Sequence, residues 1–213
     1  MTVVSRRRQG KSYLVANLII QAYAKSFSEI LVLSNTIDTD PIYPQALGKI
    51  PNVTLFDINK RDIDNDLLKE IWDRQKKRFK EDPKKNDLLI IFDDLGEKFK
   101  GREMRKMMNV YFQKSRHPKI SFICCVQSIN NCTAEQKSNT TQWVVFGLDP
   151  DALKKVSLTL ATAEKDRYET TDYIVKNTHK KHSWIMIDLE AESDDTVYQA
   201  YDPDTNKTSA GVQ

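Results

Sequence analysis

Residues 5–12 decide the fold, and they read Ser5-Arg6-Arg7-Arg8-Gln9-Gly10-Lys11-Ser12 after a short apolar run at residues 2–4. The stretch matches the phosphate-binding pattern G-x-x-x-x-G-K-[ST] except at its first position, where Ser5 stands in place of glycine. A glycine before the lysine lets the backbone approach phosphates, and the amides that follow it open a helix whose dipole favours anions. The pattern predicts a nucleotide-binding loop made of Arg8, Gln9, Gly10, Lys11, Ser12 and Tyr13.

Two side chains of this loop have distinct expected roles. Lys11 is expected to reach the β- and γ-phosphates of the nucleotide, and Ser12 to place its hydroxyl on Mg²⁺. The residues from 13 to 20 are mainly apolar, which favours a helix docked on a sheet. The alternative is a basic turn that caps a helix, and Ser5 is the best argument for it.

A second apolar run, at residues 88–92, ends in the acidic pair Asp93 and Asp94. Ligands of open α/β sheets bind at the carboxyl ends of strands, where these two side chains would lie. We expect Asp93 to contribute to the Mg²⁺ site and Asp94 to polarise the attacking water. Alone, the pair could be an ordinary turn. Together with the phosphate loop it predicts an ATPase with ATP and Mg²⁺ as cofactors, because both halves are needed to hold one Mg²⁺.

Strand-length apolar runs alternate with helical patterns along the whole chain. Strands are expected at residues 2–4, 30–33, 53–56, 88–92, 120–126, 143–146 and 184–187, and helices at residues 11–25, 63–80, 102–114, 149–158 and 163–177. This order predicts an α/β fold of the P-loop NTPase type, with a mainly parallel central sheet flanked by helices on both faces. Residues 35–52 read as a long irregular loop, whose role the sequence leaves open.

Length and composition narrow the class of protein. We expect one domain over residues 1–201 and a polar tail at residues 202–213, for which disorder is one option. The chain has 30% charged and 39% hydrophobic residues, and no apolar run approaches the length of a membrane span. Cys124, Cys125 and Cys132 lack metal-site spacing and are expected to be packed as thiols. The net charge of +3 is weak evidence for nucleic acid.

A third strand, at residues 120–126, ends in Gln127, whose amide can donate to a γ-phosphate and accept from water. The segment Arg116-His117-Pro118-Lys119-Ile120-Ser121-Phe122-Ile123, followed by Gln127-Ser128, lies downstream of Asp93-Asp94 and the Gly10-Lys11-Ser12 loop. This order of motifs resembles the genome-packaging ATPases of the FtsK–HerA class, with the best match to the poxvirus-type packaging ATPase of large DNA viruses and virophages. The resemblance covers roughly residues 3–146.

The resemblance implies a RecA/FtsK-like motor that drives double-stranded DNA into a preformed capsid. Implied partners are double-stranded DNA bound without regard to sequence, further copies of the chain in a ring, and a capsid or portal vertex. The implied location is the host-cell cytoplasm, a viral factory or the virion. By position, Lys11 and Ser12 match the phosphate-loop residues, Asp93 and Asp94 the acidic pair, and Gln127 a polar sensor.

Two sets of arginines compete for the role of arginine finger. Arg116 would act on the nucleotide of a neighbouring subunit. Arginine-rich phosphate loops also resemble those of large terminase motors, so Arg6, Arg7 or Arg8 could act within its own subunit, and the sequence does not choose between them. The basic residues Lys98, Lys100, Arg102 and Arg105 either contact DNA or form a solvated helix start.

Two other functions stay open at this point. One is a replication or repair ATPase that remodels a protein–DNA complex. The other is a nucleotide-binding scaffold without turnover, in which Ser5 impairs the phosphate loop.

Overall fold

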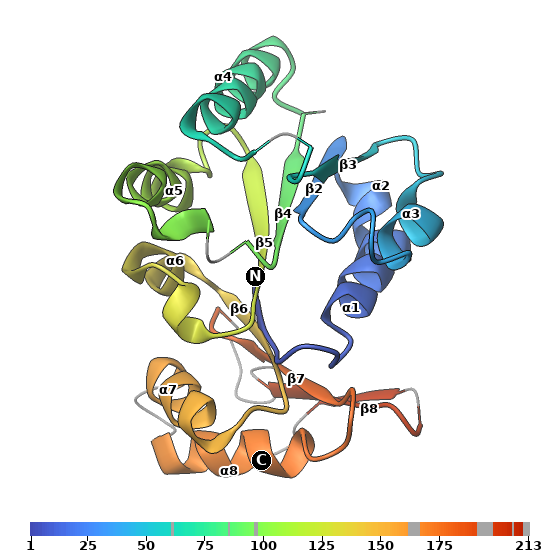
Figure 1. Cartoon of the computed structure of the whole chain (residues 1–213), viewed down its shortest axis with the longest axis vertical. Coiled ribbons are helices and arrows are strands. Elements are labelled where there is room, and N and C mark those ends of the chain that lie inside the picture. The colour runs from blue at the N-terminus through green and yellow to red at the C-terminus, as the bar shows by residue number, and fades with distance from the viewer. Residues whose placement is uncertain are drawn as a thin grey trace. The chain divides into compact units, whose positions relative to one another are not determined.

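The apolar runs form strands in the computed structural model, which describes residues 1–60, 62–84, 86–95, 98–161, 167–190, 198–205 and 207–210 (Figure 1). Contacts between Cα atoms divide the chain into two compact units. Unit 1 comprises Met1–Gly10, Val126–Cys132 and Thr140–Gln213, and unit 2 comprises Lys11–Cys125 and Thr133–Asn139. The sequence predicted a single domain over residues 1–201, whereas the contacts group the residues into these two units.

Parallel strands form the centre of unit 2. They are β2 (Glu29–Ser34), β3 (Val53–Asp57), β4 (Leu88–Asp93) and β5 (Ile120–Val126), in the spatial order β3-β2-β4-β5. All residues of β4 are buried, as expected for a continuously apolar strand that is covered on both faces. The register places Ser34 beside Asp93 and Asp93 beside Cys125, so the carboxyl ends of three strands meet at one edge.

Helices cover both faces of these strands (Figure 1). On one side lie α1 (Lys11–Leu18), the π-helical turn η1 (Ile19–Tyr23), α2 (Ala24–Ser26) and α3 (Ile42–Leu47). On the other side lie α4 (Asn65–Glu81) and α5 (Arg102–Lys114), with the short η2 (Lys98–Lys100) and α6 (Ala134–Asn139) next to α5. The helix α4 begins after Asp64, whose side chain accepts a 2.8 Å hydrogen bond from the Leu67 N–H.

The core of unit 2 joins the second group of helices to the strands. Leu68 and Ile71 of α4 and Tyr111 of α5 pack with Ile90 and Phe92 of β4. These residues recur at the three- and four-residue spacing of a helix and at the two-residue spacing of a strand, which is the pattern that predicted the elements.

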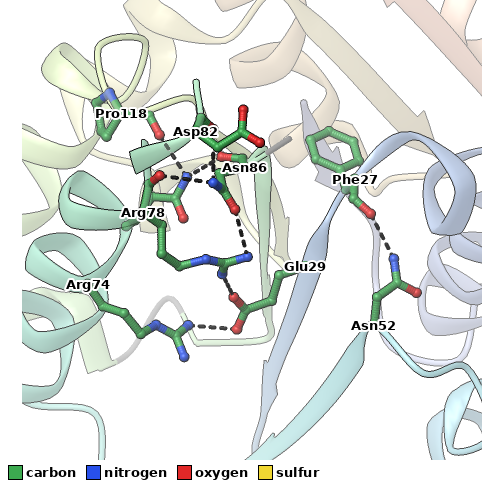
Figure 2. Close-up of polar contacts among 9 residues, drawn as sticks. Phe27, Glu29, Asn52, Arg74, Arg78, Asp82, Asn86 and Pro118 are labelled. Atoms are coloured by element: carbon green, nitrogen blue, oxygen red, sulfur yellow. Dashed lines mark hydrogen bonds and ion pairs between the residues drawn. The ribbon is translucent and has the colours of Figure 1, made fainter. Parts of the chain in front are cut away.

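A polar network fastens α4 to the amino-terminal end of the strands (Figure 2). Glu29, the first residue of β2, accepts from Arg74 over 2.6 Å and also from Arg78. Gln75 is buried and donates to the carbonyls of Asn86 at 2.5 Å and Pro118 at 2.9 Å. The network lies at the amino-terminal ends of the strands, so none of these contacts lies at their carboxyl ends.

Unit 1 has its own strands and core. Strand β1 (Thr2–Val4) runs parallel to β6 (Gln142–Phe146), and β7 (Trp184–Asp188), β8 (Tyr198–Asp202) and β9 (Lys207–Ala210) follow as antiparallel neighbours. Its helices are η3 (Ile129–Asn131), α7 (Pro150–Leu160) and α8 (Arg167–Asn177). Trp143, Val156, Ile174 and Ile185 form part of its core.

The structure corrects several predictions from the sequence. Residues 35–52 are not wholly irregular, because they contain α3, and α6, β8 and β9 were not predicted. The predicted polar tail contains β9, so it is not wholly irregular either. The first residues of the helix predicted at 163–177 lie outside the described residues.

Two other expectations concern side chains and membranes. Cys124, Cys125 and Cys132 are buried thiols, as expected. In the part of the chain that the structure describes, no helix is long and apolar enough to cross a membrane.

Candidate nucleotide-binding site

Four predicted residues meet at the carboxyl edge of unit 2. The Lys11 ammonium, at the first residue of α1, lies 3.9 Å from Asp93 Oδ1 and 3.9 Å from Asp94 Oδ1. The Ser12 hydroxyl donates a 3.1 Å hydrogen bond to Asp93 Oδ2. These contacts join a helix start to the end of β4 across 81 residues of sequence.

Tyr43 of α3 is a further member that sequence reasoning missed. Its hydroxyl is buried and donates a 2.8 Å hydrogen bond to Asp93 Oδ2. The helical spacing of Tyr43 and Leu47, both fully buried, was the available signal, but Pro41 and Pro44 made the segment read as a loop.

Asp93 is a buried carboxyl group in which one oxygen accepts hydrogen bonds and the other does not. The pKa of Asp93 is raised above its ordinary value, because the effect of burial outweighs the opposite effects of Lys11 and of the hydrogen bonds from Tyr43 and Ser12. Oδ2 accepts both hydrogen bonds, and Oδ1 is buried without a hydrogen bond from any described residue. A carboxylate oxygen with open lone pairs beside a serine hydroxyl is a donor set that suits Mg²⁺, which usually takes only one or two carboxylates from the protein. The residues therefore fit the predicted magnesium site.

Asp94 faces a different environment from its neighbour. Its side chain is 29% exposed, against 3% for Asp93. Its φ of 60° lies in the left-handed region, which aspartate tolerates better than most residues, and its N–H donates to the Cys125 carbonyl over 3.0 Å. The two acids therefore differ in exposure, and their division of roles stays a prediction.

Ser5 is accommodated without backbone strain. Among the described residues other than glycine, positive φ occurs only at Arg8, Asp94, Lys119 and His182, so position 5 needs no glycine conformation. Ser5 is buried, its N–H donates to the Val126 carbonyl over 3.1 Å, and its hydroxyl donates to the Arg6 carbonyl over 2.8 Å. The departure from the motif is therefore compatible with a formed loop.

The loop arginines differ in their contacts within unit 1. Arg7 Nε donates to Gln127 Oε1 over 3.2 Å, and Arg6 Nε donates to the Gly147 carbonyl over 3.3 Å. Arg8 is exposed and has a φ of 61°. Gln127, the predicted sensor, is thus paired with Arg7 of the loop.

Gln9, Gly10 and Tyr13 complete the predicted nucleotide-binding loop. Gln9 Oε1 accepts a long hydrogen bond of 3.5 Å from the His182 N–H. Gly10 has a φ of 95°, which would strain any side chain there, and an added Cβ would lie 3.2 Å from His182 Nδ1, so the His182 side chain would have to shift slightly. Tyr13 is 64% exposed, and its backbone carbonyl accepts a hydrogen bond from the side-chain amide of Asn17.

Arg116 does not join the acidic pair of its own chain. It is exposed in the turn before β5, near the position where Ile120 pairs with Leu88, the first residue of β4. Asp93 ends β4 five residues later, which corresponds to roughly 17 Å of strand. Arg116 therefore lies at the opposite edge of the unit 2 strands from Asp93.

Comparison with known proteins identifies the family. A family model described as Poxvirus A32 protein matches residues 1–210. The chain belongs to this family. No curated protein sequence matches it.

Solved structures show the same fold as this A32 family member. The DNA-packaging ATPase B204 of Sulfolobus Turreted Icosahedral Virus has a TM-score of 0.69 at 19% identity, over 95% of this chain and 96% of that chain. The genome packaging NTPase B204 of Sulfolobus turreted icosahedral virus 2, solved with AMPPCP, has a TM-score of 0.66 at 16% identity, over 95% and 96%. The cytoplasmic domain of the Thermomonospora curvata Type VII secretion ATPase EccC has a TM-score of 0.62 at 10% identity, over 89% of this chain and 24% of that chain. The predicted resemblance to packaging ATPases and the predicted α/β P-loop fold are confirmed.

Proposed function

We propose that this A32 family member hydrolyses ATP to translocate double-stranded DNA into a viral capsid. The convergence of Lys11, Ser12, Asp93 and Asp94 at one strand edge carries the proposal, because these are the groups that a phosphate–Mg²⁺ site needs. The family assignment and the fold shared with the two B204 packaging proteins support the same conclusion.

Lys11 would bind the β- and γ-phosphates, and Ser12 with Asp93 would hold Mg²⁺. When bound, the ion would neutralise charge that develops on the phosphate oxygens. Lys11 lies near both carboxylates, so it balances their charge before the nucleotide arrives.

Asp94 would accept a proton from water as the water oxygen bonds to the γ-phosphorus. The bond from the γ-phosphorus to the β,γ-bridging oxygen breaks, which yields ADP and phosphate. The partial exposure of the Asp94 side chain supports its role as the general base, since a general base must reach a water molecule. Gln127 stays the proposed γ-phosphate sensor, and its pairing with Arg7 links it to the loop.

We assign the arginine finger to Arg116 of a neighbouring subunit in a homo-oligomeric ring. Its place at the far edge of the strands supports action on another subunit's nucleotide rather than its own. DNA binding would rest on phosphate contacts and be independent of sequence. Of the predicted DNA-contacting residues, Arg102 and Arg105 are exposed, and Lys98 forms a 2.8 Å ion pair with Asp62. A capsid or portal vertex would be the docking partner, in the host cytoplasm, a viral factory or the virion.

Steady-state ATPase activity with and without double-stranded DNA tests the proposal. We expect turnover in the parent protein that rises with DNA and with protein concentration, and its loss in Lys11→Ala. A translocation assay, in which the protein displaces a third strand from a DNA triplex, then separates a motor from a remodelling ATPase. Nucleotide binding without turnover would contradict the proposal and leave the scaffold function.

A further inference from the structure

We propose that Tyr43 is a positioning residue for the magnesium site, acting through the Asp93 carboxylate. The inference rests on the proposed function, because it concerns the same site. The observation behind it is the 2.8 Å hydrogen bond from the Tyr43 hydroxyl to Asp93 Oδ2. The Tyr43 side chain has no exposed surface.

The hydrogen bond fixes which carboxylate oxygen remains open. Oδ2 accepts from both Tyr43 and Ser12, while Oδ1 accepts no hydrogen bond from the described residues and lies 3.9 Å from the Lys11 ammonium. Oδ1, whose lone pairs are unused, would be the oxygen that Asp93 offers to a cation. Groups that orient a metal-binding carboxylate in this way commonly contribute 10- to 100-fold to metal affinity.

Tyr43 is a second restraint on the Asp93 carboxylate, beside Ser12. Ser12 is itself a proposed ligand of Mg²⁺, and its hydroxyl can face the cation with a lone pair while its proton is donated to Asp93 Oδ2. Tyr43 donates to Asp93 from a different element, α3, which packs against α1. It holds the Asp93 carboxylate whether or not Ser12 does.

The position of the tyrosine is itself secured by packing. Tyr43 and Leu47 are fully buried, and the Tyr43 hydroxyl donates to Asp93 from this packed position. A rigid donor holds the carboxylate in one rotamer, which is the condition for a preorganised metal site.

The test is Tyr43→Phe, which removes the hydroxyl and keeps the ring. Affinity for a fluorescent ATP analogue is measured by titration at a series of Mg²⁺ concentrations, together with thermal unfolding. We expect the Mg²⁺ concentration for half-maximal tight binding to rise roughly 10-fold or more, while affinity measured in EDTA stays at the parent value. In the Asp93→Asn background, Tyr43→Phe should cause no further shift, because the carboxylate that it positions is gone.

Tyr111→Phe is the matched control. Tyr111 is also a fully buried tyrosine of unit 2, but its hydroxyl donates to the Leu68 carbonyl in the core. It should change thermal stability without changing the Mg²⁺ dependence. If Tyr43→Phe fails to fold, Tyr43→Met, which also lacks the donor, takes its place.

The outcomes separate this inference from the proposed function. An unchanged Mg²⁺ dependence in folded Tyr43→Phe overturns the positioning role, as does an equal shift in Tyr111→Phe. A parent protein whose nucleotide affinity does not respond to Mg²⁺ overturns the magnesium site itself, and the proposed function with it.

Discussion

Arg7 Nε donates a 3.2 Å hydrogen bond to Gln127 Oε1, which ties an arginine of the phosphate loop to the residue that follows β5. Arg116, the candidate finger that would act on a neighbouring subunit, lies at the strand starts of unit 2, away from Asp93 of its own chain. The two arginines are therefore expected to act differently: Arg7 within its own subunit and Arg116 on a neighbour.

Subunit mixing distinguishes these roles. We expect Arg116→Ala and Lys11→Ala each to lose about 10³-fold or more in turnover when assayed alone. In a mixture, Arg116→Ala subunits supply an intact phosphate loop and Lys11→Ala subunits supply an intact Arg116, so we expect measurable ATPase activity to return. Arg7→Ala mixed with Lys11→Ala should not recover, because both changes damage the loop of their own subunit. Recovery with Arg7→Ala but not with Arg116→Ala would reverse the assignment.

The acidic pair should divide its work between binding and turnover. Asp93→Asn removes the charge beside Ser12 and Lys11, so we expect it to weaken Mg²⁺-dependent nucleotide binding. Asp94→Asn leaves the Asp93 contacts in place, so we expect nucleotide binding within about threefold of the parent and turnover reduced by about 10²- to 10⁴-fold. Equilibrium nucleotide binding and single-turnover hydrolysis measure the two effects, and equal defects in both variants would contradict the division.

Gly10→Ala should disable the loop without unfolding the protein. The φ of 95° is unfavourable for alanine, and the new methyl group would lie 3.2 Å from His182 Nδ1. We expect loss of ATP-analogue binding by at least about tenfold, with a stability cost of about 1–3 kcal/mol. Gly101→Ala is the control, because its Cβ would meet nothing within 4 Å and its φ is −62°. Unaltered nucleotide binding in Gly10→Ala would show that the loop tolerates a side chain.

Glu29→Gln should lower the stability of the protein and spare the nucleotide site. The carboxylate pairs with Arg74 and Arg78 of α4, is only 17% exposed, and lies at the opposite end of the strands from Asp93. Loss of these charge-assisted contacts is expected to reduce the free energy of unfolding by about 1–3 kcal/mol, as measured by urea denaturation. Glu103→Gln, which removes an exposed ion pair with Lys106, should have little effect. Equal stability of both variants would mean that the network of Figure 2 contributes little.

Elements with strong local signals could be predicted from the sequence. The predicted strand at residues 120–126 and helix at residues 102–114 match β5 (Ile120–Val126) and α5 (Arg102–Lys114), because an uninterrupted apolar run and a clear helical period specify them locally. The helix α3 was missed because Pro41 and Pro44 are turn signals, and the burial of Tyr43 and Leu47 against the rest of unit 2 outweighs them. Strand β9 was missed because its pairing with β8 depends on a neighbouring strand and not on an apolar run of its own.

The sequence by itself determined which chemical groups Lys11, Ser12, Asp93 and Asp94 bring to the site. The motif spacing and the apolar runs before these residues place each at the carboxyl end of a parallel strand or at a helix start. Only the tertiary structure decided that Tyr43 holds Asp93, that Arg7 pairs with Gln127, and that Arg116 lies at the far edge of the strands. These are contacts between segments tens of residues apart, or distances set by strand register. Such relationships depend on how the elements pack, which local sequence patterns do not encode.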